Sequence, residues 1–234
     1  MSRRTNVINN ILSMGLTIAA VFLVAQICNA RYTGVNFFAV IGLLASGAAI
    51  TGFLCTFSHE AGHLIAGKKN GFAFVSVSVW FFRWRKVGKK TVFDFVLPGD
   101  AAGYTEMTPK STDNLEKRFK KMTAGALWLS FFPMLIGLIP IFVKGTPLWV
   151  YAIVAMFLPM GATTFFGNAL PMSGGGAKND GAVIYGLNKK DDDSRVSLAV
   201  LSVQSELYNG KTPAQIEEKY YFDVPQLAED DLNF

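Results

Sequence analysis

Apolar residues gather in four long runs that polar stretches separate. The runs cover about residues 7–28, 35–66, 122–143 and 147–170. Each is long enough for a transmembrane α-helix, which needs about 20 predominantly apolar residues to cross the hydrocarbon core of a bilayer. We therefore predict four transmembrane helices.

The stretch between the second and third runs has a different period. Residues Phe72–Phe82 alternate between apolar and small polar side chains, and Thr91–Leu97 has the composition of a returning strand. Alternation with a period of two is typical of a β-strand. We read Arg83–Lys90 as the turn, and we predict a membrane-associated β hairpin on the cytoplasmic side over residues 71–103. The polar stretch 112–121 is predicted to be helical and leads into the third run.

From residue 188 the chain is polar, with helical patterns at Val196–Tyr208 and Pro213–Tyr220. Thr212 is predicted to cap the second of these, because proline suits the first position of a helix. The predicted fold is an α-helical integral membrane protein. Residues 1–187 form its transmembrane core, and residues 188–234 form a small soluble, helical C-terminal tail.

The composition supports a membrane protein. Hydrophobic residues make up 51% of the chain and charged residues 17%, whereas soluble domains carry about 25% charged residues. The net charge of +5 is explained by basic cytoplasmic loops next to anionic lipid, so we expect no nucleic-acid partner. Cys28 and Cys55 lie in apolar runs without a metal-binding spacing, and we predict no disulfide scaffold.

The distribution of lysine and arginine predicts the orientation. Twelve of these residues lie between Lys68 and Lys121, six lie in the tail from Lys178 onward, and Arg3 and Arg4 precede the first run. The two remaining loops carry one each. Because positive loops stay in the cytoplasm, we expect both termini there. The predicted location is the plasma membrane of a prokaryote, in which the chain is a multi-pass protein.

The only two histidines of the chain lie near the end of the second run, as His59-Glu60-x-x-His63. This spacing puts two imidazoles on one face of a helix with a carboxylate beside them, as in zinc sites whose glutamate is a general base. An ionisable side chain at the bilayer centre costs about 2.5–3.5 kcal/mol on insertion scales and is usually functional. We predict a metal site, with Zn²⁺ as the ion.

A third ligand must come from a later carboxylate. Most candidates are also explained as solvated loop charges. Asp180 differs, because it follows an apolar run that ends in a glycine-rich turn and precedes the short apolar stretch 182–187. The chain could there return to the depth of the histidines. The other candidates are Asp94, Asp100, Glu106, Asp113, Glu116 and the acidic residues of the tail.

His59-Glu60-x-x-His63 late in one span, followed by Asn168-x-x-Pro171 and Asp180-Gly181 after a later span, resembles the site-2 protease family of intramembrane zinc metalloproteases. The resemblance covers roughly residues 35–187. The interval between Asn168 and Asp180 is longer here than is usual in that family. In the family a membrane-associated β hairpin follows the histidine-bearing span, and the aspartate is the third zinc ligand.

The resemblance implies a zinc metalloendopeptidase that cleaves transmembrane or membrane-proximal segments of a protein or peptide substrate. His59, His63 and Asp180 would hold the zinc ion, and Glu60 would be the general base. Asn168 would bind the substrate or the oxyanion, although an interhelical hydrogen bond explains it equally well. An exposed strand edge of the hairpin would pair with the extended substrate.

Two alternatives remain open. A CAAX-type membrane metalloprotease has a glutamate as third ligand, and Glu106 or Glu116 would supply it here, although neither lies on a predicted span. A catalytically silent zinc-binding adaptor or immunity protein would need the ligands alone. Glu60 argues against this second alternative, because a structural metal site has no use for a base.

Overall fold

The computed structural model describes residues 3–97, 102–174 and 177–227 and is mostly helical, with a small antiparallel sheet. Four of its helical segments are long and apolar enough to cross a membrane. They are α1 (Arg3–Arg31), α2 (Phe37–Lys69), α3 (Leu115–Ile136) with the short α4 (Ile139–Phe142), and α5 (Leu148–Ala169). The four predicted apolar runs are thus found as four such helical segments.

The helix boundaries follow local chemistry. The side chain of Asn36 accepts hydrogen bonds from the N–H groups of Phe38 and Ala39, which caps the start of α2. The predicted polar helix and the third apolar run form one continuous helix, α3, which ends at Ile136. Pro140 has no N–H to donate to the carbonyl of Ile136 and lies at the start of α4, where proline is tolerated, whereas Pro133 lies inside α3.

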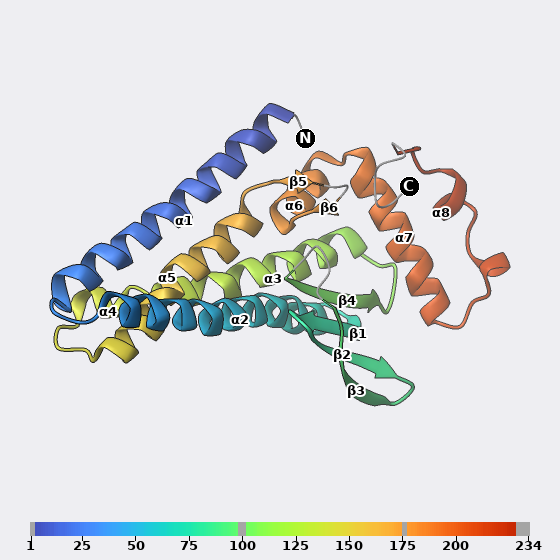
Figure 1. Ribbon diagram of the computed structural model, residues 1–234. Coiled ribbons are helices and arrows are strands. Elements are labelled where there is room, and N and C mark those ends of the chain that lie inside the picture. The colour runs from blue at the N-terminus through green and yellow to red at the C-terminus, as the bar shows by residue number, and fades with distance from the viewer. Residues whose placement is uncertain (1–2, 98–101, 175–176, 228–234) are drawn as a thin grey trace.

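Helices α2, α3 and α5 pack against one another (Figure 1). Small residues allow the close approach of α2 and α3. A Cβ added to Gly62 would lie 2.5 Å from Cα of Ala126, and Gly125 is just as tightly packed against Ala66. Close backbone contact through small residues is the usual way in which helices associate in a membrane.

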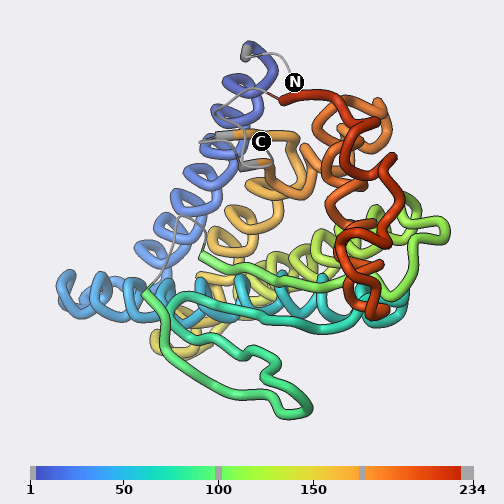
Figure 2. The backbone as a smooth tube through the Cα atoms, turned by 90° about the vertical axis from the view of Figure 1, so that its right-hand side faces the viewer, coloured from blue at the N-terminus to red at the C-terminus, as the bar shows by residue number. Residues whose placement is uncertain are grey.

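Helix α1 packs on α5, where the hydroxyl of Tyr151 donates a 2.9 Å hydrogen bond to the carbonyl of Val24. It diverges from α2 towards its N-terminus, as Figures 1 and 2 both show. Its first turns therefore lie near α6 (Asp180–Lys189) and the short strands β5 (Ser173–Gly174) and β6 (Ala177–Lys178), on the side of the bundle away from α2.

The predicted hairpin is a four-stranded antiparallel sheet in the order β3-β2-β1-β4. Its strands are β1 (Phe72–Val79), β2 (Phe82–Val87), β3 (Lys90–Phe95) and β4 (Gly103–Pro109). Strand β4, which lies at the end of the predicted hairpin range and beyond it, was not predicted. Residues 98–101, which include Asp100, lie outside the described residues.

The prediction that Arg83–Lys90 is a turn was wrong, because most of this segment is strand β2. Trp84 and its neighbour Phe82 face aromatic residues of β3, while Arg83 and Arg85 both bond to Asp94. Aromatic and basic residues thus alternate over residues 82–85 of the strand. The turn itself is confined to residues 88–89, where Gly88 has a φ of +60°.

Helix α6 is followed by α7 (Asp192–Tyr208), which packs on β4 and α6. Because α6 runs through residue 188, the predicted boundary between core and tail falls inside a helix. The predicted helix at 213–220 is instead a 3₁₀ turn, η1 (Pro213–Gln215), and the short α8 (Lys219–Phe222). Buried Ile216 lies between them with an extended backbone.

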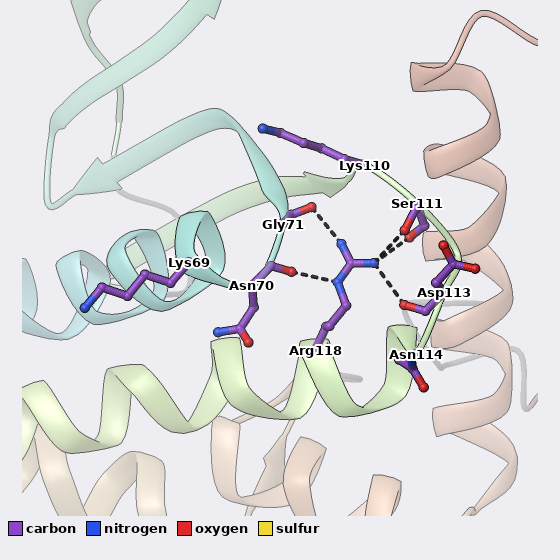
Figure 3. Close-up of a pocket in the computed structure, with 8 residues that line it drawn as sticks. All are labelled: Lys69, Asn70, Gly71, Lys110, Ser111, Asp113, Asn114 and Arg118. Atoms are coloured by element: carbon purple, nitrogen blue, oxygen red, sulfur yellow. Dashed lines mark hydrogen bonds between the residues drawn. The ribbon is translucent and has the colours of Figure 1, made fainter.

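Arg118 of α3 joins the end of α2 to the connection that precedes α3 (Figure 3). Its guanidinium donates to the carbonyls of Asn70 and Gly71, both at 2.7 Å, and also to Ser111 and the carbonyl of Asp113. These bonds fix the histidine-bearing end of α2 against α3.

Candidate metal centre

The two histidines of α2 converge with Asp180, the first residue of α6. Nε2 of His59 lies 3.2 Å from Oδ2 of Asp180, and Nε2 of His63 lies 3.3 Å from the same oxygen. One ligand atom from each of the three residues lies within 4.8 Å of the other two. The structure thus brings together the three residues that the motifs predicted.

This arrangement fits a metal ion. Oδ2 of Asp180 is buried and has no hydrogen-bond partner among the described residues, although two imidazole nitrogens face it. Two ligand atoms that each lie about 2.0 Å from a tetrahedral ion are about 3.3 Å apart, which matches the two distances from Asp180 to the histidines. Two nitrogens and one oxygen could therefore share a divalent ion.

Ser130 of α3 sets the tautomer of His59. Its Oγ donates to the carbonyl of Ala126 at 2.8 Å and lies 2.8 Å from Nδ1 of His59. Because the hydroxyl proton is used on Ala126, Nδ1 of His59 is the donor in this second contact. The proton of the neutral imidazole is then on Nδ1, which leaves the lone pair of Nε2 directed at the metal position.

Glu60 is buried next to the two histidines, and strand β4 holds its carboxylate. The hydroxyl of Thr105 donates a 2.6 Å hydrogen bond to Oε2 of Glu60. Gly103 lies so close that an added Cβ would be 2.5 Å from Oε1 of Glu60. The start of β4 thus covers the carboxylate and fixes its direction.

A cavity of about 730 Å³ contains the site. It is lined by Glu60, His59, His63 and Asp180, and by parts of β4, α3, α6 and α7. Asn10 of α1 and Asn168 of α5 also line it. Nδ2 of Asn168 donates to the carbonyl of Thr164 in its own helix at 2.8 Å. The prediction that Asn168 binds substrate stays a prediction.

Asn179 was not singled out in the sequence and is the anchor of Asp180. Its Nδ2 donates to the carbonyls of Gly167 and Leu170, and its Oδ1 accepts from the N–H groups of Met172 and Ala182. The bond to Ala182 is a helix cap, so an asparagine just before an apolar helical stretch was the available signal. Asn179 thereby fixes the start of α6 to the end of α5.

The other predicted carboxylates are engaged elsewhere in the described part of the chain. Asp94 bonds to Arg83 and Arg85, Glu106 accepts from Ser76, and Glu116 pairs with Lys120. None of them, nor Asp113, belongs to the described group of metal-ligating residues around the histidines. Asp180 is thus the carboxylate that the structure brings to the two imidazoles.

Comparison of the chain with protein-family models, with curated proteins and with solved structures finds no match. The function is therefore inferred from the geometry of the chain itself. This geometry consists of a His-His-Asp group, a buried glutamate beside that group, and four helical segments that are long and apolar enough to cross a membrane.

Proposed function

We propose that this chain is an intramembrane zinc metalloendopeptidase of the site-2 protease type, which cleaves transmembrane or membrane-proximal segments of other proteins or peptides. One observation carries the proposal: three metal-ligating atoms converge beside a buried carboxylate that Thr105 holds in place. A purely structural metal site has no need of an oriented base.

His59, His63 and Asp180 would hold the ion. In that position zinc would lower the pKa of a water molecule to about 7 and polarise the scissile carbonyl. Ser130 keeps His59 in the tautomer that can ligate. Glu60 accepts the proton of the attacking water and passes it to the leaving amine as the peptide bond breaks.

The position of β4 at the end of the sheet supports the proposal that the substrate is a peptide. Strand β4 is at the end of the sheet and pairs with β1 on one side only, among the described strands. Residues Gly103, Tyr104 and Thr105 of β4 line the cavity. A segment that unwinds into an extended chain could pair with this edge and bring its carbonyl to the zinc position.

The aromatic and basic residues of β2 and β3 support the proposal that the chain lies in a bilayer. Phe82, Trp84, Phe93 and Phe95 form a continuous aromatic cluster on β2 and β3, and Phe95 is 70% exposed. Aromatic side chains of this kind sit at membrane interfaces, and the neighbouring lysines and arginines suit anionic headgroups. With the predicted orientation, the site is entered from the cytoplasmic side.

The proposal is tested by comparing membrane proteomes of cells that express the wild type or Glu60→Gln. We expect new protein termini inside or next to transmembrane segments only with the wild type. Zinc content should be equal in the two proteins, because Glu60 is not a ligand. Identical termini in both strains would overturn the protease mechanism and would favour a silent zinc-binding membrane protein.

A further inference from the structure

Three asparagines lie in the first turns of α1, directly before and inside an apolar run. They are Asn6, Asn9 and Asn10. Amide side chains in a helix that crosses a membrane need polar partners, because lipid offers none. The proposed catalytic residues include none of the three. Their partners therefore indicate what this end of α1 does.

Asn6 and Asn9 bond to the main chain that leads from α5 to Asp180. Asn6 makes a reciprocal pair with Ser173, because Nδ2 donates to the carbonyl at 2.6 Å and Oδ1 accepts from the N–H at 2.9 Å. Nδ2 of Asn9 donates to the carbonyl of Pro171 at 2.8 Å. These bonds join parts of the chain that are more than 160 residues apart.

The same segment is bonded directly to the neighbour of the third ligand. The N–H of Met172 donates to Oδ1 of Asn179 at 2.9 Å, and the N–H of Asn179 donates to the carbonyl of Met172 at 3.1 Å. Residues 171–173 are therefore held by α1 on one side and hold Asn179 on the other. Asp180 follows in the next position.

We propose that Asn6 and Asn9 are positioning residues of the metal centre, which hold residues 171–173 so that the carboxylate of Asp180 meets the two imidazoles. Helix α1 contributes no ligand. It nevertheless determines how well the site is assembled. This inference rests on the proposed metal centre and adds helix α1 to it.

Asn10 bonds within α1, to the carbonyl and to Oδ1 of Asn6 (2.9 and 3.4 Å). Thr17 offers a control on the same helix. Its hydroxyl donates to the carbonyl of Ser13 at 3.1 Å and lies 3.1 Å from the hydroxyl of Thr163 on α5. No described hydrogen bond joins it to residues 171–173. Replacement of Thr17 by valine removes a polar contact between α1 and α5, yet it leaves the segment before Asp180 bonded.

The experiment compares Asn6→Leu/Asn9→Leu with Thr17→Val and the wild type, each as the purified full chain. Zinc affinity is measured by competition with a chelator, and the absorption spectrum of the Co²⁺-substituted protein reports the ligand geometry. Thermal unfolding of the metal-free proteins checks the fold. Leucine is chosen because it favours membrane insertion. Asn6→Asp is a milder second variant. It keeps the acceptor for the N–H of Ser173 but lacks the donor.

We expect the double variant to bind zinc about 10- to 100-fold more weakly, as when outer groups that orient metal ligands are removed, with an altered Co²⁺ spectrum. Thr17→Val should match the wild type, and Asn6→Asp should fall in between. Equal zinc affinity and spectra in the double variant and Thr17→Val would overturn this inference and leave the metal centre standing. Absence of zinc binding in the wild type would overturn the metal centre itself.

Discussion

The hydroxyl of Thr105 donates a 2.6 Å hydrogen bond to Oε2 of Glu60 and thereby joins an edge strand to the helix of the two histidines. The two residues are 45 positions apart. The sheet is thus part of the candidate site and is not only an appendage to the helices.

Replacement of Thr105 by valine removes this bond while it keeps the shape of the side chain. A hydrogen bond to a charged group contributes about 1.5–3 kcal/mol, so we expect the cleavage rate to fall about 10- to 100-fold. Zinc content should not change. Thr108→Val on the same strand is the control and should keep the wild-type rate. Equal rates in both variants would show that Thr105 does not orient the base.

Replacement of Gly103 by alanine should displace the carboxylate of Glu60. The new Cβ would lie 2.5 Å from Oε1 and 2.8 Å from Cγ of Glu60, which no side chain tolerates without movement. We expect loss of cleavage with zinc retained. Gly52→Ala on α2 is the control, since its Cβ would meet Trp80 at an ordinary 3.4 Å. Wild-type cleavage by Gly103→Ala would contradict the close contact.

Replacement of Ser130 by alanine removes the acceptor for Nδ1–H of His59. Loss of such a partner lowers metal affinity by about 10- to 100-fold, which competition with a chelator measures. Ser58→Ala is a matched control, because Ser58 also bonds from α2 to α3, at the carbonyl of Leu129 (2.9 Å), without a contact to an imidazole. If both variants lose the same affinity, packing of the two helices and not the tautomer is the cause.

The pairing of β2 with β3 should become less stable in acid. Arg83 and Arg85 hold the pKa of the Asp94 carboxyl well below its usual range. A carboxyl whose pKa is lower in the folded than in the unfolded chain stabilises the fold at pH values above its unfolded pKa, which is about 3.9 for aspartate. This stabilisation is lost as the pH falls below that value towards the folded pKa. Protection of the β2–β3 amides from hydrogen exchange should therefore be constant between about pH 5 and 7 and fall below about pH 4. Asp94→Asn should lack this decrease, and an unchanged pH profile in that variant would exclude the ion pair as its cause.

The sequence predicted the parts of the fold that depend on local pattern. Four apolar runs gave four helical segments, because length and hydropathy alone distinguish them. The spacing of His59 and His63 placed them on one helical face, as the 3.6-residue period requires. Asp180 was found through its position after a glycine-rich turn, and the structure brings it to both imidazoles.

The sequence did not predict contacts that depend on tertiary packing. Thr105 and Ser130 lie far from the motif in sequence and are ordinary residues in an edge strand and an apolar helix. Strand β2 carries the basic residues Arg83, Arg85 and Lys86, with Lys89 just beyond its end, and these charges mask the alternation of aromatic and basic residues at 82–85. The bonds of Asn6 and Asn9 join the start of α1 to the segment that follows α5, and no local sequence pattern reveals such a long-range contact.

The zinc content of the purified protein tests the central claim most directly. Elemental analysis is applied to the wild type, Glu60→Gln and Asp180→Ala, purified in parallel in detergent. The comparison separates the proposed ligand, Asp180, from the proposed base, Glu60. We expect one zinc ion per chain in the wild type and in Glu60→Gln, and a large loss in Asp180→Ala. A wild type without zinc, or an Asp180→Ala variant that keeps zinc as tightly as the wild type, would show that His59, His63 and Asp180 do not form the zinc site.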